Sequence, residues 1–247
     1  MGIFKRKNKD NFDINVPKIV VGKKGGKSES YNRLKDNVIY YSDNGKNKVF
    51  HIESSVSGEG KSTVLINLAV ALVRSGKKVV VLDLDFRRPK IHRAFNVANF
   101  NGIAEYMLDQ CAKEDLIKQT EYGVDVINRG KAAQNASIIF TSNKFKELVD
   151  GLKEEYDFVL FDCPPVLLVS DYIHISKLSD AAIFVVCFGT THRSQLKESI
   201  ELLKRNDIKI LGTVITYRNF GKYGMKYGGY YNGAYYRGVK NRYMSEN

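Results

Sequence analysis

The stretch from residue 49 to residue 85 constrains the fold more than any other part of the chain. Residues 49–55 (VFHIESS) are rich in β-forming side chains and predict a strand. A glycine-containing turn follows, and apolar side chains then recur at helical spacing over residues 61–74. Residues 78–83 predict a second strand. The order of strand, turn, helix and strand predicts a nucleotide-binding βαβ unit.

The turn contains the residue types that phosphate binding requires. Its sequence is Ser57-Gly58-Glu59-Gly60-Lys61-Ser62-Thr63. Glycines let several backbone N–H groups approach a triphosphate closely, and the helix that follows points its positive end at the phosphates. Lys61 can reach the β- and γ-phosphates, and the Ser62 hydroxyl can ligate Mg²⁺. Since the usual consensus has another glycine where this chain has Ser55, the predicted ATP site depends also on the turn lying between a strand and a helix.

Acidic residues follow two of the predicted strands. Asp83 and Asp85 leave the strand at residues 78–83, and Arg87 comes soon after them. A second apolar run, residues 157–162, ends in Asp162. The carboxyl ends of parallel strands form the ligand-binding edge of such a sheet, so these carboxylates are expected to face the phosphates. There they can hold Mg²⁺, and one can accept a proton from an attacking hydroxyl.

The remaining periodicity completes an α/β fold. Six predicted strands alternate with helices, which predicts a doubly wound, mostly parallel sheet flanked by helices. The other strands are expected at residues 123–128, 181–188 and 209–216. Helices are expected at residues 28–41 (opened by a Ser28 cap), 102–110, 113–120, 135–140, 143–155 and 192–205.

The net charge of +12 lies entirely in the two ends of the chain. Residues 1–48 hold 12 Lys/Arg against 5 Asp/Glu, residues 217–247 hold 6 against 1, and residues 49–216 hold 21 of each. We therefore expect a basic N-terminal segment with a short helix for contacts to partners, a neutral P-loop domain and a C-terminal tail. Nucleic-acid-binding domains carry a basic face on the folded body, so no nucleic acid is expected. Basic ends favour an anionic lipid surface, an acidic partner or a tail that gains negative charge, although they could also simply aid solubility.

The C-terminal tail is unusually rich in tyrosine. From Phe220 to its end it carries seven of the chain's 15 tyrosines, at Tyr223, Tyr227, Tyr230, Tyr231, Tyr235, Tyr236 and Tyr243. Their spacing matches neither a strand face nor a helix face, and the intervening glycines oppose both structures. Aromatic rings among basic residues could stack on single-stranded nucleic acid. The alternative is that the tyrosine hydroxyls are phosphate acceptors.

Together these features resemble the bacterial tyrosine kinases of capsular and exopolysaccharide systems, in particular the cytoplasmic catalytic subunit whose membrane adaptor is a separate protein. The resemblance runs from about Glu29 to the C-terminus. It rests on residues 57–63 as Walker A, on Asp83-x-Asp85-x-Arg87 as Walker A′, on Asp162 as Walker B and on the tyrosine cluster. Partition and cell-division ATPases of the same superfamily carry an additional lysine where this chain has Val56, and they have no tyrosine-rich tail.

The resemblance implies transfer of the ATP γ-phosphate to the tail tyrosines and control of polysaccharide synthesis and export. It implies that residues 57–63 bind ATP, that Ser62, Asp83 and Asp162 surround Mg²⁺, and that Asp83 or Asp85 accepts the tyrosyl proton. It further implies a transmembrane adaptor that activates the kinase, a homo-oligomeric ring, a cognate tyrosine phosphatase, and a cytoplasmic location at the inner face of the membrane. No apolar run approaches the ~18 residues of a membrane span, as expected of such a subunit.

The chain departs from the family in the helix that mediates ring contacts. The family motif is Glu-x-x-Arg-x-x-Arg, whereas this chain has Glu29, Asn32 and Lys35, with Arg33 out of phase. Lysine is a point charge and cannot replace a bidentate arginine. Two other functions therefore stay open: a surface-cycling P-loop ATPase without kinase activity, and a non-catalytic scaffold that binds ATP.

Overall fold

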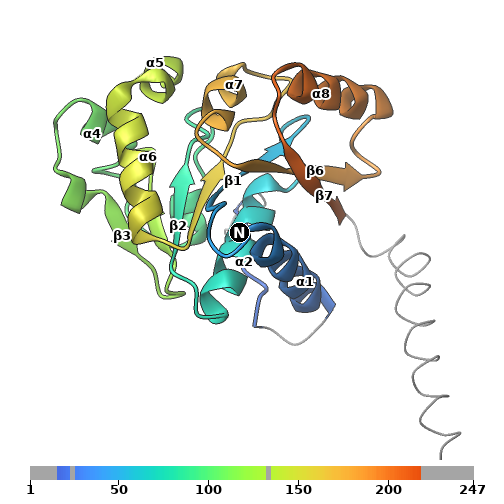
Figure 1. Ribbon diagram of the computed structural model, residues 1–247, viewed down its shortest axis with the longest axis horizontal. Helices are drawn as coiled ribbons and strands as arrows, with labels where there is room; N and C mark the ends of the chain where they lie inside the picture. Colours follow the sequence, from blue (N-terminus) through green and yellow to red (C-terminus); the bar gives the residue numbers. More distant parts are fainter. Residues whose placement is uncertain (1–15, 23–25, 132–134, 218–247) are drawn as a thin grey trace, which may run out of the picture.

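The computed structural model describes residues 16–22, 26–131 and 135–217. In this part of the chain, seven strands form one sheet in the order β3-β4-β2-β5-β1-β6-β7, with helices on both faces (Figure 1). Every neighbouring pair is parallel except β3 and β4. The predicted fold class is thereby confirmed. The strands are β1 (Val49–Ser54), β2 (Val79–Asp83), β3 (Ile117–Gln119), β4 (Asp125–Ile127), β5 (Phe158–Asp162), β6 (Ala181–Phe188) and β7 (Ile210–Tyr217).

The three central strands are completely buried because helices cover both of their faces. Every residue of β1, β2 and β5 is buried, as expected for parallel strands between two helical layers. β1 pairs with β5 on one side and with β6 on the other. β2, β4 and β5 lie on one side of β1, and β6 and β7 lie on the other. The direction in which successive strands are added to the sheet therefore reverses at β1. The loop after β1 therefore opens at the switch point where open α/β sheets bind ligands.

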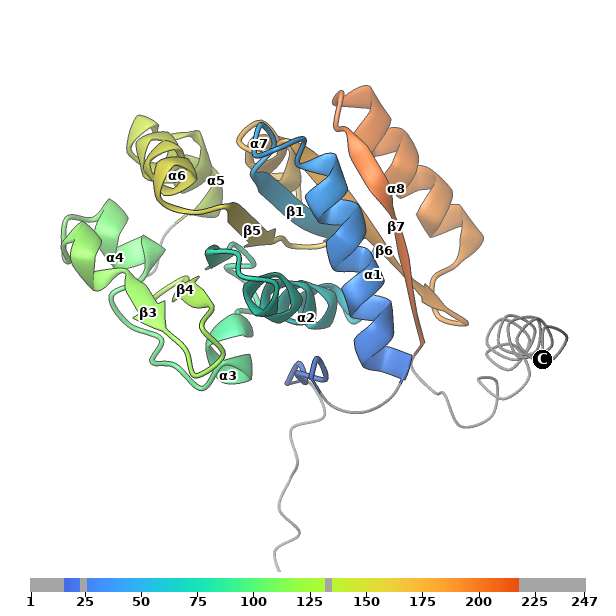
Figure 2. The same ribbon diagram turned by 60° about the horizontal axis from the view of Figure 1, so that its bottom comes forward.

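The helices form two layers, which Figure 2 shows on either side of the sheet. One layer consists of α1 (Gly26–Tyr41), α2 (Lys61–Arg74) and α3 (Ile91–Ala94), which share one hydrophobic core with the sheet. The opposite layer consists of α4 (Ile103–Met107), α5 (Ala136–Thr141), α6 (Asn143–Glu155), α7 (Asp171–Ser176) and α8 (Arg193–Arg205). The long helix α2 packs against β1, β2 and β5, which fixes its N-terminus beside the ends of all three strands.

Three expectations about secondary structure were wrong. Residues 113–120 do not form a helix: a 3₁₀ turn at Lys113–Asp115 leads into β3, which pairs antiparallel with β4 at the edge of the sheet. The short helices α3 and α7 were not predicted. Ser28 does not cap α1, since the helix already includes Gly26, and its hydroxyl instead accepts a hydrogen bond from the Gly22 N–H at 3.1 Å.

Candidate active site

The loop that follows β1 is held in a conformation that only glycine adopts readily. Gly58 has a φ of +87° and Gly60 a φ of +100°, both in the left-handed region. Gly60 directly precedes α2, so the free N–H groups of the first helical turn face the loop. An anion seated there meets backbone donors and the positive end of a 14-residue helix. The predicted phosphate-binding loop thus has the expected position between β1 and α2.

The first two residues of α2 lie against the carboxyl edge of the sheet. Lys61 is only 6% exposed, and its Nζ donates to Ser54 Oγ at 3.2 Å. The Ser62 hydroxyl donates to Asp162 Oδ2 at 2.7 Å. One helical turn therefore brings an ammonium group to the end of β1 and a hydroxyl to the end of β5.

Asp83 and Asp162 end neighbouring strands in register. β2 pairs with β5 so that these two residues lie opposite each other, and both are buried. Asp83 Oδ2 accepts the N–H groups of Lys90 and Ile91 at 3.0 and 3.1 Å. In contrast, Asp83 Oδ1 and Asp162 Oδ1 have no hydrogen-bond partner among the described residues. A buried carboxylate oxygen without a partner is costly, so this pair is suited to a cation or its waters.

Burial and mutual repulsion perturb the titration of these acids. Burial is the main cause that raises the pKa of Asp162, to about 6, while Lys61 and the Ser62 hydrogen bond act in the opposite direction. Burial and the neighbouring Asp162 raise the pKa of Asp83 well above its usual value. The two carboxylates therefore resist ionisation together until positive charge arrives.

The site fits Mg²⁺ bound together with a nucleotide. The described residues contain no cluster of three or more His, Cys, Asp and Glu side chains that could hold a metal on their own. Mg²⁺ prefers oxygen ligands, keeps several waters and usually takes one or two protein carboxylates beside substrate phosphates. Ser62, Asp83 and Asp162 supply such oxygens, and bound Mg²⁺ would neutralise charge on the phosphates.

The residues that follow β2 close one side of the loop. Asp85 is half-buried, and its Oδ1 accepts the Arg88 N–H at 3.1 Å. Arg87 is exposed. The neighbouring Arg88, which the motif did not single out, donates from Nη1 to Ser57 Oγ at 3.3 Å. The Arg88 guanidinium thus links the segment that follows β2 to the phosphate-binding loop.

Sequence reasoning also missed a third buried acid. Glu53, in β1, is fully buried, and neither of its carboxylate oxygens has a hydrogen-bond partner among the described residues. Burial raises its pKa well above the usual value, and Asp162 raises it further, while Lys61 lowers it. The alternation of side chains along a strand could have indicated that Glu53 shares a face with His51. His51 Nε2 lies 3.8 Å from Glu53 Oε1.

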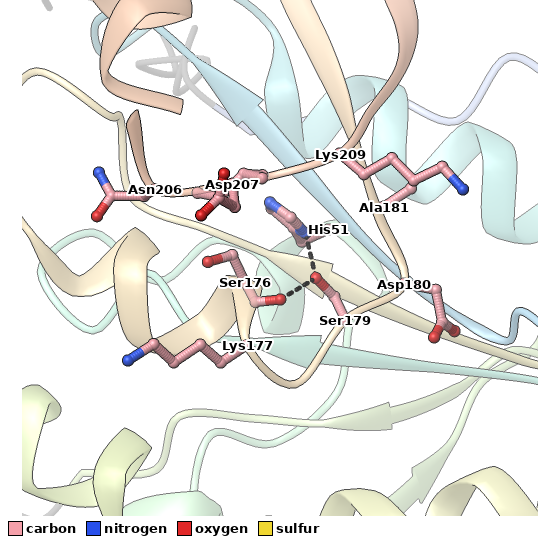
Figure 3. A pocket seen from close by; sticks show the side chains of 10 residues that line it. His51, Ser176, Lys177, Ser179, Asp180, Ala181, Asn206, Asp207 and Lys209 are labelled. Atoms are coloured by element: carbon pink, nitrogen blue, oxygen red, sulfur yellow. Dashed lines mark hydrogen bonds between the residues drawn. The ribbon is translucent and has the colours of Figure 1, made fainter. Parts of the chain in front are cut away.

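His51 leads to a cavity at the opposite edge of the sheet from the phosphate-binding loop. Its Nδ1 lies 2.6 Å from Ser179 Oγ, which also donates to the Ser176 carbonyl (Figure 3). The cavity measures about 270 Å³ and is lined mainly by the segments that precede β6 and β7. Burial lowers the pKa of His51 to about 3, so the imidazole is neutral at physiological pH. The nucleotide motifs do not reach this cavity.

Two further sequence predictions concern the ends of the chain. In α1, Arg33 Nε lies 3.6 Å from Glu29 Oε1, and Lys35 Nζ lies 2.8 Å from Asp36 Oδ1. The seven tail tyrosines lie outside the described residues.

None of the helices in the described part of the chain combines the length and apolarity that crossing a membrane requires.

The fold and the site define a nucleotide-binding P-loop protein of the parallel-sheet class. Residues 47–211 match the family model described as an AAA domain. The septum site-determining protein MinD of Pyrococcus horikoshii, solved with Mg-ADP, has a TM-score of 0.58 and 27% identity, over 68% of this chain and 69% of that one.

Other relatives define the family more narrowly. The tyrosine-protein kinase YwqD of Bacillus subtilis is 31% identical over 220 residues, which are 89% of this chain and 90% of that protein. The solved chimerical protein CapA2B2 has a TM-score of 0.76 and 31% identity, over 83% of this chain and 93% of that one. This chain therefore belongs to the bacterial tyrosine-protein kinases. Some relatives are longer: the chain covers 26% of the tyrosine-protein kinase ptk of Acinetobacter johnsonii, at 31% identity over 188 residues.

Proposed function

We propose that this protein transfers the γ-phosphate of ATP to the tyrosines of its own C-terminal cluster and thereby regulates capsular or extracellular polysaccharide synthesis and export. The supporting observation is the pair of buried, in-register carboxylates of Asp83 and Asp162, the second of which accepts the Ser62 hydroxyl and feels the charge of Lys61 at the start of α2. Such an arrangement positions a triphosphate with Mg²⁺, and phosphoryl transfer requires mainly positioning and charge stabilisation from the protein.

Each residue of the site has a role in this proposal. Lys61 binds the β- and γ-phosphates, and the backbone of residues 57–63 surrounds them. Ser62, Asp83 and Asp162 hold Mg²⁺ or its waters. Asp83 or Asp85 accepts the proton of the attacking tyrosine hydroxyl. Asp85 is the more accessible of the two, being half-buried, whereas one oxygen of Asp83 is already bound to two backbone N–H groups.

The proposed biological setting follows from the relatives and from the charge distribution. A relative from Klebsiella pneumoniae, 29% identical over 172 residues, is named for the cps region. We propose that residues 1–48 and 217–247 flank a kinase domain at residues 49–216, that the protein is recruited to the inner face of the membrane by a transmembrane adaptor, and that it forms homo-oligomers. A tyrosine phosphatase would reverse the modification. The basic ends suit an acidic adaptor segment or anionic lipids.

Phosphosite mapping on the purified full chain tests this function. The protein is incubated with ATP and Mg²⁺, with and without the cytoplasmic peptide of an adaptor, and phosphotyrosine is mapped by mass spectrometry. We expect modified tail tyrosines in the wild type and none in Lys61→Met, a substitution of similar length whose folding is checked by thermal unfolding. Phosphate release without modification would instead indicate a surface-cycling ATPase. Nucleotide binding with neither product would indicate a scaffold.

A further inference from the structure

Glu59 is an acidic residue placed in the middle of a loop that binds anions. Its side chain is 1% exposed, although a glutamate in a loop normally lies in solvent. The carboxylate Oε2 accepts the Val56 N–H at 2.9 Å, and Oε1 accepts the Thr191 hydroxyl. The backbone carbonyl of the same residue accepts the Thr216 hydroxyl at 2.7 Å. Both acceptor groups of Glu59 are therefore held by residues outside the sequence motif.

The two threonines belong to the part of the sheet formed by β6 and β7. Thr191 lies in the turn between β6 and α8, and its Oγ1 accepts the Cys187 N–H at 2.9 Å. Thr216 is the penultimate residue of β7, which pairs with β6 and is the edge strand of the sheet formed by the described residues. Thr216 also lies near the next loop residue and leaves no room for a side chain there, since a Cβ built on Gly60 would lie 3.3 Å from Thr216 Cγ2. We call Glu59, Thr191 and Thr216 the Glu59 clamp.

The clamp has two physical consequences for an anion in the loop. First, it holds the carboxylate of Glu59 on hydrogen bonds inside the protein, so that its negative charge is not free to repel the phosphates. Second, it fixes the backbone between Gly58 and Gly60, both of which have left-handed φ values. Glycine has little conformational preference of its own, so these two residues alone would not hold the loop in this conformation. Donors that are fixed before the ligand arrives cost less entropy on binding.

We propose that Thr191 and Thr216 are positioning residues for nucleotide binding, which act through Glu59 and make the phosphate-binding loop dependent on the docking of β7. The inference rests on the nucleotide-binding part of the proposed function, but not on the identity of the phosphate acceptor. Because β7 is the last strand before the tyrosine-rich tail, a displacement of this strand would be transmitted to the loop by a single hydrogen bond.

Isosteric substitutions in the full-length protein test the clamp. Thr216→Val and Thr191→Val remove the hydroxyl but keep the shape, whereas Thr216→Ser keeps the hydroxyl. Thr213→Val is the matched control, because Thr213 is exposed on the same strand and takes no part in the clamp. The dissociation constant of a fluorescent ADP with Mg²⁺ is measured, together with the thermal unfolding of the nucleotide-free protein and the KM and kcat for ATP.

We expect each valine variant to weaken ADP binding and raise the KM for ATP about fivefold to tenfold, the loss that follows from one well-placed hydrogen bond. The change in kcat should be smaller, and Thr216→Ser and Thr213→Val should stay within about twofold of the wild type. In a Glu59→Ala background, Thr191→Val should have no further effect, because its partner is gone.

Valine variants that bind ADP within twofold of the wild type would overturn the clamp, and so would a Thr216→Ser variant as weak as Thr216→Val. A wild-type protein that does not bind ADP would contradict the proposed function itself, so the two failures can be told apart.

Discussion

We predict that neutralising one of the buried acids, Asp162, stabilises the nucleotide-free protein. Asp162 is 1% exposed, and burial raises its pKa to about 6 from 3.8. The folded state thus binds a proton more tightly than the unfolded state, so ionisation of Asp162 destabilises the fold increasingly as pH rises from about 4 to above 6. A difference of about two pKa units corresponds to roughly 3 kcal/mol at pH 7. Asp162→Asn keeps an oxygen for the Ser62 hydroxyl and removes this cost.

The assay is urea unfolding of the full chain with EDTA and without nucleotide. We expect Asp162→Asn to raise the free energy of unfolding by about 3 kcal/mol at pH 7 and by less than about 1 kcal/mol at pH 4, which lies close to the pKa of Asp162 in the unfolded chain. Asp207→Asn is the matched control. Asp207 is exposed and has a φ of +54°, a conformation that asparagine tolerates, so its substitution should change stability by less than about 0.5 kcal/mol.

Added Mg-ADP should reduce this difference in stability, and it should reverse the order of the two proteins above roughly 200 times its dissociation constant, where binding adds more than about 3 kcal/mol. The ligand stabilises whichever protein binds it, and the wild type retains the carboxylate that suits Mg²⁺. We therefore expect Mg-ADP to raise the unfolding temperature of the wild type and to leave Asp162→Asn nearly unchanged. An Asp162→Asn variant that is less stable than the wild type at pH 7 without metal, or whose advantage in stability grows as the pH falls, would contradict this prediction.

Three other perturbations have defined outcomes. The pKa of His51 is lowered to about 3 by burial, so the fold loses stability as pH falls below the unfolded value of 6.5; His51→Gln should lose about 2 kcal/mol less than the wild type between pH 8 and pH 5 in urea unfolding. Gly102→Ala should destabilise the protein by about 1–3 kcal/mol or more, because the new Cβ would lie 2.4 Å from the Gly130 nitrogen, while Gly212→Ala, with open space around it, should not. Phosphorylation of about three tail tyrosines should cancel and reverse the +5 charge of residues 217–247, and it should weaken self-association in sedimentation relative to a Tyr→Phe tail variant.

Local patterns predicted the elements that carry the nucleotide motifs. The helix at residues 61–74 and the helix at residues 143–155 have their predicted bounds, because their apolar spacing and helix-ending residues are local signals. Asp83 and Asp162 were predicted at the carboxyl ends of strands, because an apolar run that ends in aspartate already locates the carboxylate at that edge of a parallel sheet, but the sequence did not predict that their two strands are neighbours. Residues 117–119 were misassigned because their strand exists only through pairing with residues 125–127, a tertiary contact.

The parts of the site that sequence reasoning missed depend on contacts between distant segments. Thr191 lies more than 130 residues from Glu59, whose carboxylate it holds, and it belongs to no nucleotide motif. Glu53 carries no local sign of burial, since a charged residue in a predicted strand is normally assigned to the solvent face. Spacing along the chain predicts which residues are suited to bind phosphate. The packing between strands, which spacing does not reveal, decides which other residues position the phosphate-binding loop.

The charges of the site require a cation for nucleotide binding. Glu53, Asp83 and Asp162 are buried around one lysine, so full ionisation would leave an excess of negative charge where a triphosphate must enter. Burial raises all three pKa values, and the charge of Asp162 raises those of Glu53 and Asp83 further, so protonation relieves part of this repulsion in the empty site. A triphosphate would restore the repulsion unless a divalent cation came between it and the carboxylates. Nucleotide affinity should therefore fall sharply when Mg²⁺ is removed with EDTA, and Asp162→Asn should show a weaker dependence on Mg²⁺. Equal ADP affinity of the wild type with and without Mg²⁺ would contradict this account of the site.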